Sequence, residues 1–506
     1  MAELTLDSLR RDGQSFMEAV SREYHQAHAG FKATAELQPI YERYRAVLGR
    51  DALELALELF RSAPAGSEER RSARTLLEWQ VESQASRVVA ALDEREIAWE
   101  GSAAIRLGDG REVPYARASI EIANAADRRE RLALDAARAS LVEGELAPLR
   151  RERLARERDF VEGLEVAPGY VATFEALSGI ELDGLAAACR AFLDETRAAW
   201  DDVLPGFLKR SLGITPAEAT RADALALLRG REYDRAFPAA ELEPAVRRQV
   251  AEMGIDPDAG GRVVHDLAER PGKRSRAFCA PVRVPEEVYL VLRPHGGQAD
   301  YTTLLHELGH ALHFAYMRPD LPFEFRWVGD NSITEAYAML FDHRMQDRGW
   351  LLRYTGLSRS DVGAFLRHAA LEELHFLRRY CAKLLYETQL YSGEVPWDAL
   401  PDLYADTLTG ATTFRYRRAD AFVDVDPRFY AARYLRAWQL QALLAEALVA
   451  RFDEDWWRNP RAGPWVVEQL FAEGQRELAT ELALRVGGGA GLSFAPLVRA
   501  IEGALA

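Results

Sequence analysis

The chain has 506 residues, of which 48% are hydrophobic and 28% charged, as in an ordinary folded globular protein. This length allows roughly two to four domain-sized units around a large buried core. With 64 basic and 79 acidic residues the net charge is -15, which argues against nucleic acid as a partner.

The sequence also argues against membrane insertion and export. Residues Met1 to Gly13 are polar and charged and lack the apolar core of a secretory signal. There is no run of about eighteen apolar residues that could span a bilayer. The three cysteines, Cys189, Cys279 and Cys381, are far apart and form neither a disulfide framework nor a CxxC zinc pattern. We therefore expect a cytoplasmic protein with no membrane partner; the sequence specifies no oligomeric state.

Apolar residues at three- and four-residue spacing predict helices over residues 1–95. The pattern then changes, and a hairpin or two short strands are predicted about the glycine turn Gly108–Gly110. The first strand is expected at Ala104–Leu107 and the second at the alternating run Ala118–Ile122.

Residues 127–160 are charge-dense and helical, with a division near Gly144 and Pro148. The many charges of this segment are predicted to form a solvated face. Helices continue over residues 163–212 and are expected to break at Pro168-Gly169 and at Pro205-Gly206.

Residues 262–294 contain the loop Pro271–Arg274 and then a strand-like run, Glu287–Leu292. A helix with a metal-binding pattern follows, and further helices are expected over residues 333–390 and 428–452, separated by a loop centred on residues 410–426. Gly487–Gly489 marks a turn before a last short helix. The chain is thus predicted to be mainly helical, with its few strands near residue 100 and near the metal pattern.

The pattern is His306-Glu307-Leu308-Gly309-His310. On a helix His306 and His310 lie four positions apart, so both imidazoles project from one face and can share one metal ion. Glu307 lies at the edge of that face, where its carboxylate can take a proton from a metal-bound water. The pattern is short and also arises by chance, so the sequence around it has to supply a third ligand.

A catalytic zinc site has three protein ligands and one open position. The metzincin pattern fails here, because His313 stands where a glycine is required and Tyr316 where a third histidine is required. Two glutamates remain as candidates. Glu324 follows a proline-containing loop, whereas Glu335 follows the capping residues Asn331–Thr334 and is expected to open a helix that runs to Met345. Glu335 is the favoured ligand.

Other residues near the pattern are predicted to support it. Asp342 returns to the face of Glu335 after seven positions and could accept the remaining N–H of a bound imidazole. His313 is expected to be a core histidine or a neighbour of the metal ligands. His295 and His343 are expected at the surface or in loops.

The run His306–His313, with a glutamate twenty-five residues after His310, resembles the M3 metallopeptidases, the group of thimet oligopeptidase and oligoendopeptidase F. Upstream, Gly272–Cys279 followed by the strand Val288–Leu292 is similar to the oligoendopeptidase F arrangement before the metal helix. The resemblance is clearest over residues 272–447.

The resemblance implies His306, His310 and Glu335 as the ligands of one zinc ion per chain and Glu307 as the general base. It also implies that Tyr430 or Tyr434, four apart on one helix face, donates to the developing oxyanion. The segment before these tyrosines departs from the thimet type, which has a histidine and a glycine-rich stretch there. This chain has Phe422-Val423-Asp424-Val425-Asp426-Pro427 instead, and which tyrosine acts is left open.

The implied fold is a mainly α, two-lobed metallopeptidase of the gluzincin type, with a deep channel and a small β-sheet next to the metal helix. The expected lobes are residues 1–205, mostly helical with a short hairpin, and the catalytic residues 206–506. Short unfolded peptides are the expected substrates, and an extended peptide is predicted to add to a strand edge at Val288, Tyr289 and Leu290.

The expected activity is endopeptidase cleavage, and two alternatives stay open. One is a zinc carboxypeptidase or dipeptidyl carboxypeptidase; the other is a catalytically silent peptide-binding protein. An aminopeptidase of the helical zinc class is less attractive, because the sequence has no GxMEN-type motif for a substrate amine.

Overall fold

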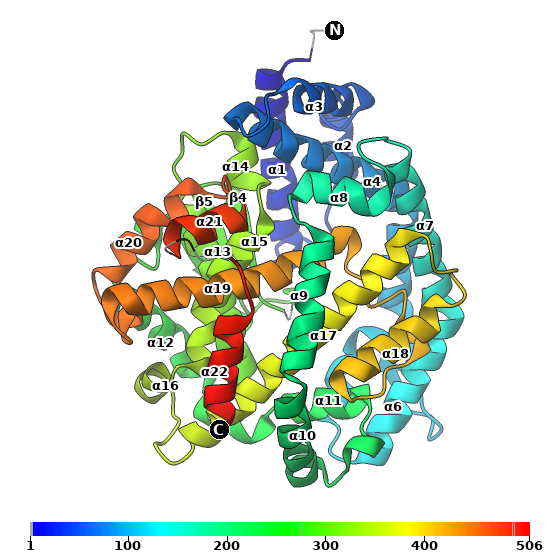
Figure 1. Ribbon diagram of the computed structural model, residues 1–506, viewed down its shortest axis with the longest axis vertical. Helices are drawn as coiled ribbons and strands as arrows, with labels where there is room; N and C mark the ends of the chain where they lie inside the picture. Colours follow the sequence, from blue (N-terminus) through cyan, green and yellow to red (C-terminus); the bar gives the residue numbers. More distant parts are fainter. Residues whose placement is uncertain (1–3, 275, 488, 490) are drawn as a thin grey trace. The chain divides into compact units, whose positions relative to one another are not determined.

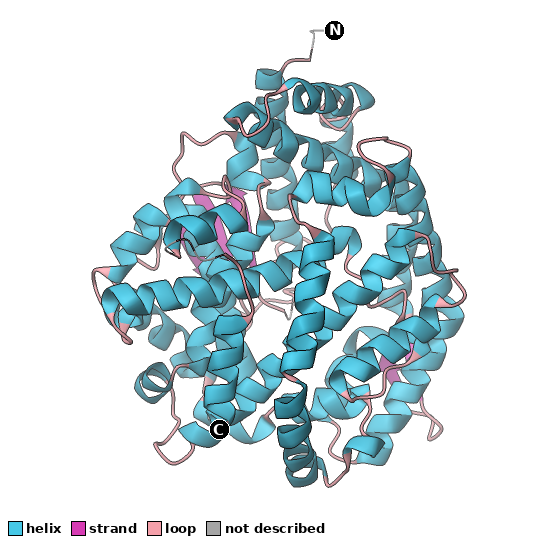
Figure 2. Cartoon of the chain, viewed as in Figure 1, coloured by secondary structure: helices cyan, strands magenta, loops and turns pink. Residues whose placement is uncertain are grey.

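The structure is a computed structural model that describes residues 4–274, 276–487, 489 and 491–506. It is mainly helical, and its described strands form two small sheets (Figure 1, Figure 2), which confirms the prediction of a mainly helical chain with few strands. None of the described helices has the length and apolar character needed to cross a membrane.

By its internal contacts the chain divides into two compact units, each built from three segments. Unit 1 comprises Met1–Val81, Glu232–Leu366 and Arg436–Leu497; unit 2 comprises Glu82–Arg231, Arg367–Leu435 and Val498–Ala506. These units do not coincide with the continuous lobes expected at 1–205 and 206–506, because tertiary contacts join segments that are distant in the sequence. The assignment of catalysis to a lobe of residues 206–506 stays a prediction.

Unit 1 holds helices from all three of its segments. They are α1 (Leu6–His28), α2 (Gln38–Arg43), α3 (Arg50–Ser62), α12 (Ala239–Glu252), α13 (Gln298–Tyr316), α14 (Phe323–Trp327), α15 (Asn331–Asp342), α16 (Arg348–Tyr354), α20 (Ala462–Gln469) and α21 (Ala479–Val486), with the larger part of α19 (Tyr430–Phe452). Its core includes a cluster around Phe16, Trp79 and Phe323 that packs α1 against α14 and the first part of α4 (Glu68–Ser102).

A three-stranded sheet of unit 1 lies beside α13. Its strands are β3 (Val263–Asp266), β4 (Phe278–Arg283) and β5 (Glu287–Val291), in the order β3-β5-β4. β5 runs parallel to β3 and antiparallel to β4. The strand predicted at Glu287–Leu292 is therefore confirmed, and it is the central strand. Pro281 lies in β4, an edge strand, which suits a residue that has no N–H to donate.

Helices α13 and α15 pack closely in unit 1 (Figure 1). Every residue of α15 from Ser332 to Phe341 is buried, as in a helix enclosed on all sides by core. The contact is close because α13 presents Gly309 to it: a Cβ atom at this position would lie 2.6 Å from Ala338 Cα and 2.9 Å from Tyr337 O. Any larger side chain must separate the two helices.

We therefore expect Gly309→Ala to destabilise unit 1 by about 1–3 kcal/mol, the usual cost of overpacking, and to weaken metal binding because α15 carries Glu335. Thermal unfolding and metal content measure both effects. Gly363→Ala, in the first turn of α17 (Val362–Ser392), is the matched control, because a Cβ there meets no atom within 4 Å. Equal stability and equal metal content of the two variants would contradict the packing argument.

Unit 2 holds most of α4 (Glu68–Ser102) and of α17, together with a two-stranded antiparallel hairpin of β1 (Ala104–Arg106) and β2 (Glu112–Pro114). Its further helices are α5 (Ala118–Asn124), α6 (Arg128–Leu141), α7 (Ala147–Glu162), α8 (Gly169–Ser178), α9 (Leu182–Glu195), α10 (Arg197–Leu212), α11 (Arg221–Leu228) and α18 (Leu400–Thr412), with the larger part of α22 (Ala495–Leu505). A five-residue π-helix, Val142–Leu146, joins α6 to α7 near the predicted division at Gly144.

Two local predictions in unit 2 are wrong. The run Ala118–Ile122 is helix α5, not a strand: Ala118 and Ile122 are buried four positions apart, while Ile120 is 54% exposed. The second strand of the hairpin is β2. Pro205 does not end a helix but lies inside α10. The carbonyl that its missing N–H would have bonded belongs to Asp201, an exposed residue.

The charge-dense segment 127–160 is not simply a solvated face, which corrects a third prediction. Arg131 is buried and lies 3.0 Å from the carboxylate of Asp223. Arg138 is buried in an ion pair with Asp420, and Glu157 is 1% exposed. The buried charges are tolerated because each has a partner of opposite charge. Such partners, distant in the sequence, are invisible to helical periodicity.

Candidate metal centre

Helix α13 positions the first three residues of the candidate site. The helix begins after Gly297, and Asp300 fastens the preceding loop by accepting a hydrogen bond from Gly296 N at 2.7 Å. Leu304, Leu308 and the small residues near them are buried, whereas His306, Glu307 and His310 form a partly exposed stripe. The predicted helix therefore holds both histidines on one face.

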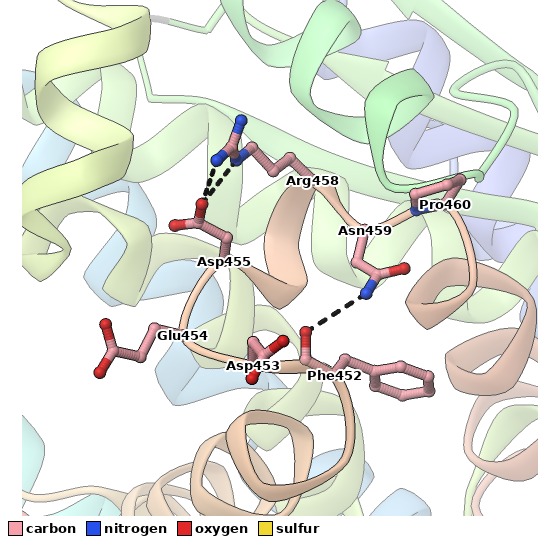
Figure 3. A pocket seen from close by; sticks show the side chains of 7 residues that line it. All are labelled: Phe452, Asp453, Glu454, Asp455, Arg458, Asn459 and Pro460. Carbon is pink, nitrogen blue, oxygen red and sulfur yellow. Dashed lines mark hydrogen bonds and ion pairs between the residues drawn. The ribbon is translucent and has the colours of Figure 1, made fainter.

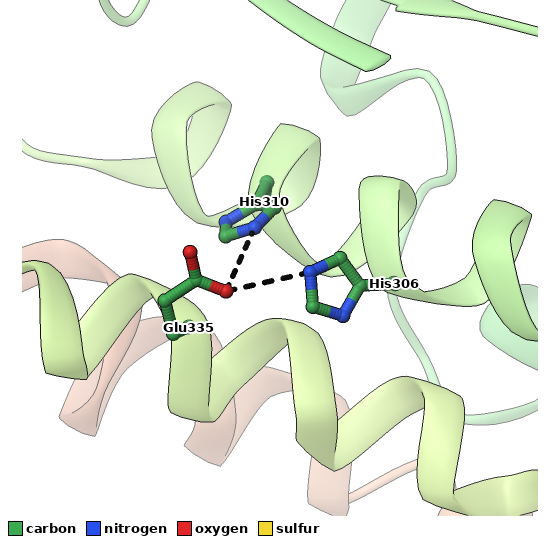
Figure 4. Close-up of side chains that lie close together, drawn as sticks. All are labelled: His306, His310 and Glu335. Atoms are coloured by element: carbon green, nitrogen blue, oxygen red, sulfur yellow. Dashed lines mark ion pairs between the residues drawn. The ribbon is translucent and has the colours of Figure 1, made fainter. Parts of the chain in front are cut away.

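Helix α15 brings Glu335 to these histidines. Glu335 Oε2 lies 3.4 Å from His306 Nε2 and 3.6 Å from His310 Nε2, and Figure 4 shows both imidazoles directed at this oxygen. One ligand atom from each of the three residues falls within 4.8 Å of the others. For metal bonds of about 2.1 Å, tetrahedral ligand atoms lie about 3.4 Å apart. The arrangement fits one metal ion held by two imidazoles and one carboxylate.

The start of α15 differs from the prediction. The helix runs from Asn331 to Asp342, so Glu335 lies in its second turn rather than opening it. The N-cap is Asp330, whose Oδ1 accepts from Ser332 N at 2.9 Å, and its Oδ2 accepts from Ala479 N at 2.9 Å. A buried carboxylate that bonds both its own helix and α21 fixes this end of α15, and Glu335 with it.

The second nitrogen of each imidazole also has a partner. His306 Nδ1 lies 2.8 Å from Asp342 Oδ2, the contact that the sequence predicted. His310 Nδ1 lies 2.8 Å from Thr334 Oγ1, a contact that sequence reasoning missed. Since Asp342 can only accept, Nδ1 of His306 carries the hydrogen and Nε2 is left for the metal. In the sequence, the only sign of the contact between Thr334 and His310 is that Thr334 directly precedes the ligand candidate Glu335.

The electrostatics of the centre favour a cation. Burial works against a charge on Glu335, but its contacts with His306 and His310 hold the pKa of this carboxyl far below its usual range. Burial also works against a charge on His306, yet the carboxylates of Asp342 and Glu335 outweigh it and raise the pKa of His306 to about 10. The surroundings that retain a proton here would also attract a divalent cation.

Glu307 is half-buried and oriented by a backbone group. Its Oε2 accepts a hydrogen bond of 2.8 Å from Cys279 N, on the edge strand β4. This contact was also missed from the sequence, because it joins residues that lie 28 positions apart. Burial, with the nearby Glu307, raises the pKa of the Cys279 thiol, so the thiol stays neutral beside the carboxylate.

The predicted peptide-binding edge at Val288, Tyr289 and Leu290 is wrong. These residues belong to β5, which is hydrogen-bonded to a strand on both sides. Val288 and Leu290 are buried, and the ring of Tyr289 stacks on that of His25 at 3.8 Å. A run of strand-forming residues indicates a strand but not its place in the sheet. The edge strand next to α13 is β4.

The tyrosines implied by the resemblance belong to unit 2, whereas the metal cluster belongs to unit 1. Tyr430 and Tyr434 are half-buried on α19, and their rings meet edge to face at 5.0 Å. They form the expected pair on one helix face. Their position facing the metal stays a prediction.

Two other candidates have different roles. Glu324 is fully buried and accepts hydrogen bonds from Arg10 and Ser72, apart from the metal cluster. His313 is fully buried, and its ring lies 4.8 Å from that of Tyr337. Burial lowers the pKa of His313 to about 3, so it is a neutral core residue between α13 and α15.

A separate acidic hollow of unit 1 lies around the loop Phe452–Pro460 (Figure 3). Asp455 is paired with Arg458 there, and Asp453 and Glu454 are exposed. Among the described residues, the His306, His310 and Glu335 cluster is the group found with metal-binding spacing. The hollow supplies no comparable set of ligands.

Comparison with known proteins does not assign the chain: no protein-family model and no curated protein matches it. The assignment of this site as a metal centre therefore depends on its geometry alone.

Proposed function

We propose that the protein is a zinc-dependent endopeptidase of the M3 type that hydrolyses short unfolded peptides. The observation that carries the proposal is the position of Glu335 Oε2, which lies 3.4 Å from His306 Nε2 and 3.6 Å from His310 Nε2. Glu307 follows His306 directly on the same helix. Two histidines and a glutamate are a ligand set of catalytic zinc. A structural zinc site would have four protein ligands.

Zinc, when bound, lowers the pKa of a water molecule toward about 7 and polarises a carbonyl group. Glu307 would take the proton of that water and pass it to the leaving amine. The Cys279 N–H holds Oε2 of Glu307, which leaves Oε1 to exchange the proton. Asp342 keeps His306 in the tautomer that leaves Nε2 for the metal, and Thr334 holds the ring of His310 in place through its Nδ1.

Two features of the chain have the chemistry to bind a peptide substrate. A phenol O–H is a suitable donor to the oxyanion of a tetrahedral intermediate, and Tyr430 or Tyr434 would supply it. An extended peptide would add at the edge of β4, near Cys279, rather than at β5. Ser21 Oγ already donates to Pro281 O at 2.7 Å, and Cys279 N donates to Glu307, so a peptide would pair with the backbone groups of this edge that these two contacts leave. Backbone pairing accepts many side chains, so pockets would set the specificity.

The test is digestion of a mixed peptide library with termini free or blocked, read by mass spectrometry. We expect internal cuts in short peptides with both termini blocked, loss of cutting with a chelator, and recovery on adding zinc. Cutting confined to free carboxyl termini would favour a carboxypeptidase. Peptide binding without cleavage by zinc-loaded protein would favour a silent binding protein, and cleavage unaffected by the chelator would contradict a metallopeptidase.

A further inference from the structure

Residues 421–429 are the last part of the segment between α18 and α19, and the helices of unit 2 bind them at each of their charged positions. These are Asp424, Asp426 and Arg428, at alternate places just before Tyr430. We call residues 421–429 the clamp segment. Its partners come from α4, α7, α17 and α18, all within unit 2.

Asp424 is held by three side chains. Arg379 forms an ion pair with its Oδ1, and Lys383 Nζ lies 3.4 Å from the same oxygen. Tyr404, on α18, donates a hydrogen bond of 2.7 Å to Oδ2 of Asp424. Burial opposes ionisation of Asp424, but these partners hold the pKa of its carboxyl far below the usual range. Asp424 is therefore a fixed anion in a buried setting.

Asp426 is held through its side chain and its backbone. Lys383 Nζ lies 2.8 Å from Asp426 Oδ1, and Asp426 N donates to Glu387 Oε1 at 2.7 Å. Arg379, Lys383 and Glu387 are spaced by four residues on α17, so they form one stripe on that helix. This stripe meets successive residues of the clamp segment and fixes its course.

Arg428 is anchored from the opposite end. Its guanidinium donates to both oxygens of Glu157 at 3.1 and 3.3 Å and to Ser86 Oγ at 2.9 Å. Glu157 is 1% exposed and also accepts from Arg153 at 3.2 Å and Tyr170 at 3.1 Å. A buried carboxylate with four donor contacts is a stable anchor, and loss of its charge would leave Arg428 poorly compensated.

The backbone at the end of the clamp segment is strained. Arg428 has φ 61° and Phe429 has φ 55°, a left-handed conformation that residues other than glycine rarely adopt. The Phe429 ring is buried 5.2 Å from the ring of Tyr391 and 5.9 Å from that of Tyr170. Such a conformation persists only where the surroundings impose it, and here they impose it directly before α19.

The tyrosine pair follows at once. Tyr430 is the first residue of α19, and the ring of Tyr434 lies 5.5 Å from that of Tyr380 on α17. Tyr380 is next to Arg379, the partner of Asp424. The same helix therefore binds the clamp segment and borders Tyr434, so the direction in which α19 starts depends on the clamp contacts.

We propose that Glu157, Lys383 and Arg428 are positioning residues that hold the Tyr430 and Tyr434 pair in one orientation through the clamp segment. The inference rests on the proposed function for its catalytic consequence. Its structural part, one fixed orientation of Tyr430, is tested without activity.

The first test is the ¹⁹F NMR spectrum of the full chain with 3-fluorotyrosine placed at Tyr430 alone. We expect one sharp line in the parent, and a shifted and broadened or split line in Glu157→Gln and in the milder Arg428→Lys. Glu152→Gln is the matched control, because Glu152 lies on α7 in a surface pair with Arg156. If Glu157→Gln folds poorly, Arg428→Lys decides. A line in Arg428→Lys identical to that of Glu152→Gln would overturn the proposal.

The second test separates positioning from stability. We expect Arg428→Lys to lower kcat for a quenched peptide about tenfold, with KM changed less than about twofold, as for a misplaced catalytic group. In a Tyr430→Phe or Tyr434→Phe background, whichever tyrosine acts, the same change should cost less than about twofold. An equal loss in all three backgrounds would show a merely structural effect and overturn the proposal. If no form hydrolyses peptide, the proposed function fails, and the fluorine spectra still decide the clamp.

Discussion

Glu307→Gln is expected to keep its metal and to hydrolyse a quenched short peptide about a hundredfold or more slowly than the parent. The amide has the size and shape of the carboxylate, and its oxygen can still accept the Cys279 N–H that now bonds Oε2 at 2.8 Å. What the variant loses is the ability to take a proton from water and return it to the amine. Initial rates at saturating peptide, beside elemental analysis of the same sample, measure the effect.

Metal content and thermal unfolding serve as controls for that variant. Glu307 is not among the three clustered ligands, so one metal per chain and an unchanged unfolding temperature are expected. A parallel Glu152→Gln variant changes a surface glutamate and should turn over normally. Normal turnover in Glu307→Gln would remove Glu307 as the general base, whatever the metal content.

Glu335→Ala is expected to abolish stoichiometric metal binding and, with it, hydrolysis. Two imidazoles alone leave an ion short of one protein ligand, and Glu335 supplies the negative charge between them. Elemental analysis after dialysis against metal-free buffer measures the loss directly. The variant removes a 6% exposed side chain, so its circular dichroism spectrum should be compared with that of the parent.

Glu324→Gln is the matched control for the ligand assignment. Glu324 is the other glutamate that the sequence offered, and it is bound to Arg10 and Ser72. This variant is expected to lose stability, because a buried ion pair is broken, while keeping one metal per chain. Full metal in Glu335→Ala together with none in Glu324→Gln would mean that the third ligand was misassigned.

The spacing of residues along a helix was readable from the sequence because it depends on helix geometry alone. Four positions place His306 and His310 on one face, and seven positions return Asp342 to the face of Glu335. The distances of 3.4, 3.6 and 2.8 Å in the structure agree with those local rules.

Contacts between segments far apart in the chain were not readable in this way. The run Val288–Leu290 indicated a strand, but its central place depends on β3 and β4 pairing on either side. The buried arginines of α6 were predicted to be solvated because their partners, Asp223 and Asp420, are remote in the sequence. The alternation of residues over Ala118–Ile122 predicted a strand, but the segment is a helix that buries one face.

The sequence by itself determined a mainly helical chain and a histidine pair on one helix face, and it pointed to a glutamate on a later helix. Local backbone geometry fixes the first two, and the pattern of capping residues suggests the third. Only the tertiary structure decided that Thr334 and the Cys279 amide orient His310 and Glu307, and that β4 is the edge strand. It also showed the ion pairs that bind Asp424, Asp426 and Arg428 before Tyr430. Those features depend on which surfaces pack together, and packing follows from the whole chain.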